Sequence, residues 1–159
     1  MEPKIPLKEP LTIFFRDITA LAGTPVYGLF WLFLILIKEY SLMITLISGF
    51  LIILFITSVL RIIYPKNRPI KQEYHNFAEK IDASSFPSMH AARAFFFSLI
   101  LMAFFEYELW ISVFLIVLAI LISYSRIFLK KHDWWDLLGG MILGTITFWV
   151  STALSGIAL

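Results

Sequence analysis

The sequence predicts an all-α integral membrane protein, a helical bundle with five spanning helices and an amphipathic or partly inserted helix at the N-terminus. Composition is the first reason, because 60% of the 159 residues are hydrophobic and only 15% are charged, and a water-soluble chain of this size has no way to bury so much apolar surface. The second reason is a set of uncharged runs close to the roughly 20 residues that cross a bilayer as a helix.

The N-terminal segment, residues 7–21, mixes apolar and charged side chains. It is therefore expected to lie in the membrane interface or to pack on the bundle rather than to span. Residues 24–37 form a short apolar run in which Pro25 suits a first helical turn. The preceding residues 18–23 can extend this run to the length of a span.

Three further runs carry no charge at all, residues 41–60, 109–125 and 137–159, and each predicts a spanning helix. Residues 88–105 have His90 and Arg93 in their first two turns and are wholly apolar afterwards. This run predicts a spanning helix whose N-terminal end is functional.

The connections define one membrane domain, residues 1–159, with no internal repeat, cleavable signal peptide or second domain expected. Residues 38–40 and 106–108 are short enough to be tight turns between antiparallel helices. Residues 64–87 form the only long polar loop, and such a loop in a compact protein is usually functional or disordered. The chain has no cysteine, which excludes disulfides and thiol nucleophiles.

Tracing the five spans places the long loop and the segment 125–136 on the same side of the membrane. All Lys and Arg residues except Lys38 belong to that side, whereas Glu39, Glu106 and Glu108 join Lys38 on the other. The tendency of cytoplasmic loops to be basic explains this distribution without any chemistry, and it favours a cytoplasmic position for the basic end.

Three local groups on the basic side point to phosphate chemistry. The first is RIIYPKNRP, in which Arg61 closes a spanning helix and Arg68 follows after a stiff, proline-containing turn. Guanidinium groups match phosphate oxygens in geometry and charge. The alternative is that each arginine only reaches toward lipid headgroups.

The second group is SSFPSMH, residues 84–90, directly ahead of a predicted spanning helix. A helix start offers free backbone N–H groups and a positive dipole end for an anion, with the Ser88 hydroxyl and His90 beside it. The alternative is that the serines are ordinary helix caps and His90 is a surface histidine.

The third group is SRIFLKKHDWWD, residues 125–136. In a helix that begins near Lys131, His132 and Asp136 lie on one face, so that the carboxylate orients the imidazole and leaves its other nitrogen free to attack. Arg126 lies roughly 120° away in an unbroken helix, which predicts a turn near Lys130 and Lys131. Asp133 is expected in the first helical turn.

In this order and spacing, the three groups resemble the signature of the type 2 phosphatidic acid phosphatase (PAP2) superfamily, usually written Lys-x6-Arg-Pro, Pro-Ser-Gly-His and Ser-Arg-x5-His-x3-Asp. The match covers residues 61–136, about half of the chain. Two positions depart from it: Arg61 stands in place of lysine and Met89 in place of glycine. The Met89 side chain is expected to crowd the phosphate.

The resemblance implies a role for each matching residue. His132 would attack phosphorus to form a phosphohistidine, Asp136 would orient it, and His90 would protonate the leaving oxygen. The phosphate oxygens would be held by Arg61, Arg68, Ser88, the N–H of Met89, and Arg126. The resemblance implies no metal and no cofactor, and the sequence offers no carboxylate cluster for magnesium.

We therefore expect metal-independent hydrolysis of a phosphomonoester or diphosphate headgroup from a membrane lipid such as phosphatidate, phosphatidylglycerophosphate or a polyprenyl diphosphate. The expected partners are the lipid substrate and the bilayer of the cell membrane, with no nucleic acid. The side that the site faces stays open, because the resemblance suggests the outer face whereas the charge distribution favours the cytoplasmic face. The alternative is a non-catalytic membrane protein that binds anionic phospholipid headgroups, although such binding needs the cations and not both histidines with Asp136.

Overall fold

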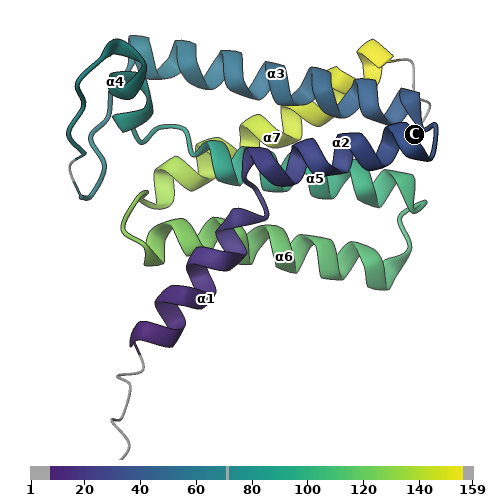
Figure 1. The fold of residues 1–159 in the computed structure, drawn as a ribbon, viewed down its shortest axis with the longest axis horizontal. Coiled ribbons are helices and arrows are strands. Elements are labelled where there is room, and N and C mark those ends of the chain that lie inside the picture. The colour runs from purple at the N-terminus through teal and green to yellow at the C-terminus, as the bar shows by residue number, and fades with distance from the viewer. Residues whose placement is uncertain (1–7, 71, 156–159) are drawn as a thin grey trace, which may run out of the picture.

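The computed structural model describes residues 8–70 and 72–155, and within these residues it contains seven α-helices and no strand. They are α1 (Lys8–Ala20), α2 (Thr24–Leu36), α3 (Tyr40–Ile63), α4 (Phe77–Ala83), α5 (Met89–Phe104), α6 (Leu109–Phe128) and α7 (Trp134–Ser155). Helices α2, α3, α5, α6 and α7 lie side by side in a bundle, and α1 leaves the bundle at an angle (Figure 1). The all-helical class is confirmed.

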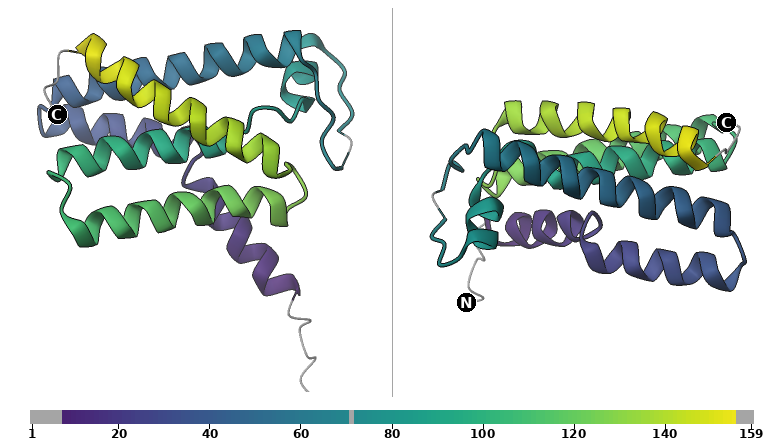
Figure 2. Two further views of the ribbon diagram at one scale, coloured as in Figure 1. Left: turned by 180° about the vertical axis from the view of Figure 1, so that it is seen from behind. Right: turned by 90° about the horizontal axis from the view of Figure 1, so that it is seen from above.

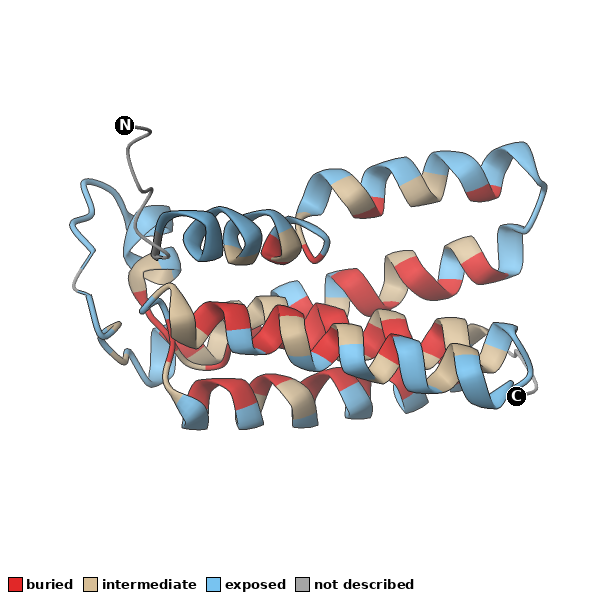
Figure 3. Ribbon diagram, turned by 90° about the horizontal axis from the view of Figure 1, so that it is seen from below, coloured by how far each residue is buried: buried red, intermediate tan, exposed pale blue. Residues whose placement is uncertain are grey.

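Three helices, α3, α6 and α7, are long and apolar enough to cross a membrane. Their outward faces are exposed and apolar, and the buried residues face the interior of the bundle (Figure 3). This distribution identifies an integral membrane protein, because lipid takes the place of water around the apolar surface. Helix α5 has 16 residues and falls short of the same criterion, so the fifth span of the predicted topology stays a prediction.

The N-terminal region differs from the sequence prediction. Helix α1 ends at Ala20, α2 begins at Thr24, and the two helices meet at a bend of 43°, so that residues 18–23 do not extend α2 into one straight span. Together the pair is apolar and long enough for one broken span. Helix α1 packs on α6, while α2 packs on α3 (Figure 2).

The two turns at the end of the bundle opposite the α6–α7 turn agree with the predicted hairpins (Figure 1). The chain reverses after α2 and after α5 through Lys38 and Glu106, both in the left-handed conformation at φ 64° and 53°. Backbone hydrogen bonds close both turns, including those from Glu39 N to Leu34 O and from Tyr107 N to Met102 O. This arrangement satisfies the last carbonyl groups of each helix.

The long loop is more ordered than its composition indicated, because it contains α4. Asn76 caps this helix by accepting a hydrogen bond from the Glu79 N–H at 2.8 Å, and the Glu79 carboxylate accepts one from the His75 N–H. The loop and α4 lie at the same end of the bundle as the α6–α7 turn (Figure 1). The basic segments separated in the sequence therefore meet at one end.

Helices α5 and α7 form the closest packed pair of the bundle. Gly140 and Gly144 of α7 make this possible, because a Cβ at these positions would collide with the carbonyl oxygens of Ser88 and Ala92. Small residues spaced four apart commonly let membrane helices approach closely. As a result, the N-terminal ends of α5 and α7 meet, and Ser88 N donates a hydrogen bond to Asp136 O at 2.9 Å.

Candidate active site

The predicted site residues gather at the basic end of the bundle. They come from the C-terminal ends of α3 and α6 and the N-terminal ends of α5 and α7, together with the loop that follows α3. Because helices that follow one another in the chain run antiparallel, α3 and α6 end, and α5 and α7 begin, at this same end of the bundle. The matched residues that the structure places here are Arg61, Arg68, Ser88, Met89, His90, Arg126, His132 and Asp136.

His132 lies before α7 rather than inside it. Helix α6 ends at Phe128, and Lys130 just after it has the left-handed conformation at φ 54°. The N–H groups of Lys131 and His132 both donate to Arg126 O. This turn confirms the reversal expected near Lys130 and Lys131 and folds His132 back beside Arg126. The expectation that the helix begins near Lys131 is wrong, since α7 begins at Trp134.

Asp133 is the reason for the later start. Its carboxylate accepts a hydrogen bond from Asp136 N at 3.0 Å, and the Asp136 carboxylate accepts one from Asp133 N at 3.0 Å. This reciprocal pair is a capping box. Asp133 is therefore the residue that caps α7 and not an acid of its first turn.

The His132 imidazole is 3% exposed and Asp136 is fully buried. The two side chains lie 3.4 Å apart from Nδ1 to Oδ2, but the geometry does not make a hydrogen bond, and Nδ1 has no other partner among the described residues. The pairing is thus electrostatic in this conformation. Burial lowers the pKa of His132 below its ordinary value, and the charges of Arg126 and Arg68 add to this effect against the attraction of Asp136. The imidazole is therefore neutral at neutral pH, as a nucleophile requires.

Lys66 is a site residue that the sequence did not identify. Its ammonium group lies 2.8 Å from Asp136 Oδ1 and 2.6 Å from Asp133 Oδ2. Burial lowers the pKa of Lys66, but hydrogen bonds to the two carboxylates outweigh burial and raise it. Lys66 falls among the unspecified positions between Arg61 and Arg68, so no local pattern distinguished it from the other loop lysines.

Arg61 and Arg126 are buried at the ends of their helices, at 5% and 6% exposure. Arg61 donates to the carbonyl groups of Ile81 and Pro87, and Arg126 donates to Thr19 of α1 at 3.4 Å. In both side chains Nε is buried and has no hydrogen-bond partner within the described chain. Each arginine therefore presents an unused donor.

Arg68 reaches the same region from the loop. It donates to Gln72 and to the Asp82 carbonyl, and its Nε is also buried without a partner among the described residues. Arg61 and Arg68 both lie near the Asp82 carboxylate, at 3.6 and 3.7 Å, a contact that the sequence did not predict. The positive charges of Arg61, Arg68 and Arg126 act on one another.

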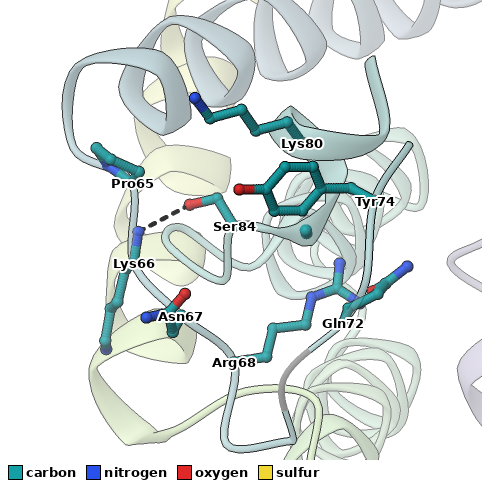
Figure 4. A pocket seen from close by; sticks show the side chains of 9 residues that line it. Pro65, Lys66, Asn67, Arg68, Gln72, Tyr74, Lys80 and Ser84 are labelled. Atoms are coloured by element: carbon teal, nitrogen blue, oxygen red, sulfur yellow. Dashed lines mark hydrogen bonds between the residues drawn. The ribbon is translucent and has the colours of Figure 1, made fainter. Parts of the chain in front are cut away.

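The loop also forms a small polar cavity of about 190 Å³ behind Arg68 (Figure 4). Lys66 donates its backbone N–H to the Ser84 hydroxyl, while its side chain turns away from that contact. Arg68 and Gln72 lie side by side on one wall, and Tyr74 lies near Ser84 (Figure 4). The hydrogen bonds from Arg68 to Gln72 and to the Asp82 carbonyl connect the two halves of the loop.

The start of α5 carries the remaining residues. Ser88 is fully buried and caps α5, because its hydroxyl oxygen accepts a hydrogen bond from Ala91 N at 3.4 Å. His90 is half-buried and interacts electrostatically with Arg126, Arg93 and His132. Met89 packs against the hydrophobic core, so its side chain contributes to packing, and the expected crowding of a phosphate stays a prediction.

Among the described residues, no group of three or more His, Cys, Asp or Glu side chains is arranged to hold a metal ion. Metal independence itself stays a prediction.

Comparison with known proteins gives one family. The PAP2 superfamily model matches residues 43–157. The chain is 31% identical over 112 residues to the provisionally named undecaprenyl-diphosphatase YbjG of Escherichia coli K12, which covers 70% of this chain and 56% of that protein. It is 37% identical over 65 residues to lipid A 4'-phosphatase of Bacteroides thetaiotaomicron, covering 41% of this chain and 28% of the other.

Two solved structures share the fold. The crystal structure of Aquifex aeolicus LpxE aligns with a TM-score of 0.75 and 26% identity, over 90% of this chain and 86% of that one. A transmembrane PAP2-type phosphatidylglycerolphosphate phosphatase from Bacillus subtilis aligns with a TM-score of 0.72 and 20% identity, over 92% and 77% of the two chains. The alignment thus covers most of the first solved structure, but only 56% of the E. coli relative and 28% of the Bacteroides relative.

Proposed function

The chain belongs to the PAP2 superfamily, and we propose that it is a membrane lipid phosphatase that hydrolyses a phosphomonoester or diphosphate headgroup through a phosphohistidine. The lipid would keep its tail in the bilayer while its phosphate enters the basic end of the bundle. The names of the relatives, an undecaprenyl-diphosphatase and a lipid A phosphatase, support a lipid phosphate as the substrate class.

The observation that carries this proposal is the set of unused arginine donors beside a buried imidazole. Arg61, Arg68 and Arg126 each have a buried Nε without a partner in the described part of the chain, and an unpaired buried donor costs free energy. A bound phosphate would supply the acceptors and neutralise the charge. Binding of a headgroup alone would not require the imidazole and carboxylate of His132 and Asp136.

The proposed reaction has two steps. In the first, Nε2 of His132 attacks phosphorus, the bond from phosphorus to the leaving oxygen breaks with its electron pair on that oxygen, and His90 supplies the proton that an alcohol leaving group needs. In the second, water attacks the phosphohistidine, the phosphorus–nitrogen bond breaks, and inorganic phosphate leaves while His90 regains a proton. Asp136 stabilises the charge that develops on His132.

The arginines would hold the three equatorial oxygens during both steps. Positioning and charge neutralisation provide most of the catalysis in phosphoryl transfer. Arginine guanidinium groups supply here the positive charge that magnesium supplies in other phosphatases. We further propose that the protein acts in the cell membrane with its basic end toward the cytoplasm.

Phosphate release from a panel of phosphatidate, phosphatidylglycerophosphate and an isoprenyl diphosphate tests the proposal. We expect release that survives EDTA, is inhibited by vanadate, and is nearly abolished by His132→Ala and by His90→Ala. The Arg16→Gln variant is the control, because Arg16 is exposed on α1 and contacts only Asp17 at 3.7 Å among the described ion pairs. Substantial turnover by the His132→Ala protein would refute the nucleophile, and activity that EDTA removes and magnesium restores would refute the metal-free mechanism.

A further inference from the structure

A fourth arginine, Arg93, is buried inside the bundle and is not part of the family signature. It follows His90 by three residues on α5, one turn and about 4.5 Å farther from the basic end. Its exposure is 5%. The sequence placed Arg93 in the first two turns of a spanning helix and counted it among the cations of the basic side, and the structure buries it within α5.

No carboxylate neutralises Arg93 among the described ion pairs. Its Nη1 donates to the Thr24 hydroxyl at 3.3 Å, and its guanidinium carbon lies 4.3 Å from the centre of the Phe50 ring. Its Nε is buried with no hydrogen-bond partner in the described chain. A charged side chain at this depth is costly and is commonly found where a function uses it.

Arg93 and Arg126 contact the two sides of the break between α1 and α2. Arg126 donates to Thr19 near the end of α1, and Arg93 donates to Thr24 at the start of α2. Helix α2 runs from this break to the end of the bundle opposite the catalytic residues (Figure 2). The direction from Arg126 to Arg93 is therefore the direction in which the tail of a bound lipid would continue into the bilayer.

A cavity of about 250 Å³ lies next to Arg93, between the α1–α2 break, α5 and α6. Arg93 is the only charged residue that lines it among the described residues, and its other walls are mainly apolar, including Val26, Phe97 and Leu118. Such a cavity suits the first part of a lipid tail. Arg93, which lines this cavity, then lies beside the part of the lipid between the scissile phosphate and the tail.

We propose that Arg93 binds a second anionic group in this position, so that the preferred substrate is a lipid diphosphate. This inference rests on the function proposed above. When His132 attacks the terminal phosphorus of a diphosphate, the bond to the bridging oxygen breaks and its electron pair stays on the departing lipid monophosphate. A permanent positive charge at Arg93 stabilises this negatively charged leaving group. A lipid monophosphate instead releases a neutral alcohol that takes its proton from His90 and offers Arg93 no charge.

The test compares two substrates with the same tail, an isoprenyl diphosphate and the corresponding isoprenyl monophosphate, with phosphatidate as a third. We expect the wild-type protein to have the higher kcat/KM on the diphosphate. Arg93→Gln should lower kcat/KM for the diphosphate by at least 30-fold and for the monophosphate by less than threefold. Arg93→Lys keeps the charge and should recover part of the preference.

Thr24→Val is the matched control, because it removes the only side-chain hydrogen bond that Arg93 makes among the described residues and keeps the guanidinium, so the preference for diphosphate should stay within threefold of wild type. Equal losses on all substrates in the Gln variant would assign Arg93 a structural role and overturn the proposal. A loss confined to phosphatidate would overturn it in favour of an ester carbonyl as the ligand. If the Gln variant does not fold, a wild-type kcat/KM for the diphosphate that does not exceed that for the monophosphate overturns it. A wild-type protein inactive on all three lipids refutes the proposed phosphatase function itself.

Discussion

Replacing Lys66 with methionine tests whether this lysine positions the Asp136 carboxylate. The substitution keeps most of the apolar stem and removes the ammonium group, which lies 2.8 Å from Asp136 Oδ1. Asp136 is fully buried, and its carboxylate would keep, among the described residues, the N–H of Asp133 as a hydrogen-bond donor and the His132 imidazole nearby. The carboxylate would then be less firmly held beside the nucleophile.

The size of the effect follows from the contacts. A hydrogen bond between charged groups contributes about 1.5–3 kcal/mol. The second contact, to Asp133, adds little because that carboxylate side chain is 41% exposed and exposed ion pairs contribute about 0–1 kcal/mol. We expect the free energy of unfolding to fall by about 2 kcal/mol, and kcat to fall roughly 10- to 150-fold if the same contact acts in the transition state.

The assay is phosphate release in detergent micelles, with kcat and KM measured separately and unfolding followed by near-ultraviolet circular dichroism. A positioning role lowers kcat and leaves KM within about threefold, and Lys66→Arg should restore part of kcat. Lys80→Met is the control, because Lys80 lines the same loop cavity and is exposed. A Lys66→Met protein with kcat within twofold of wild type refutes the reasoning, and a rise in KM alone would make Lys66 a phosphate ligand.

Four further outcomes are expected. Met89→Gly should lower the free energy of unfolding by about 2 kcal/mol, because the Met89 side chain packs on the core. Met89→Leu keeps an apolar side chain and should leave this free energy nearly unchanged. Equal thermal stability of the two variants would contradict the packing role. Gly144→Leu should lower the free energy of unfolding by about 3 kcal/mol and remove most of the phosphatase activity, because the side chain forces α5 and α7 apart. Gly28→Leu should be tolerated, because a side chain at Gly28 meets open space. In a chain that carries His75→Gln and His90→Gln, His132 is the remaining histidine, and nitrogen-15 NMR should show that it titrates below its ordinary pKa of 6.5. Because burial lowers the pKa, the imidazole should still be mostly neutral at pH 6.5. A titration midpoint above pH 6.5 would contradict the burial argument. Glu73 is exposed and, unlike Asn76, does not cap α4, so a cysteine can replace it without disturbing that helix. This cysteine should resist a membrane-impermeant thiol reagent in intact cells, and rapid labelling would place the basic end outside.

Much of the architecture was predictable because the signals are local. Uncharged runs predict α3, α6 and α7, since a helix in lipid must satisfy its own backbone and present apolar side chains. The motif spacing also predicted which residues share the basic end, because helix ends on one side of a membrane are neighbours in a small bundle. The Asn76 and Glu79 pair predicts the start of α4 as a capping box, although the sequence interpretation had assigned this segment to a loop.

The remaining features depend on contacts between distant parts of the chain. Lys66 reaches Asp136 across 70 positions, and no local pattern distinguishes it from Lys80. The break between α1 and α2 and the placement of Arg93 depend on which helix packs against which, since Thr24 and Phe50 belong to other elements. Helical periodicity placed His132 inside α7, but the Asp133 cap outweighed it once the turn at Lys130 closed on Arg126. Hydropathy therefore determined the long spanning helices, and motif spacing determined which residues are proposed to carry the chemistry. Packing alone decided which donors stay unpaired among the described residues, because pairing depends on distance in space and not in sequence.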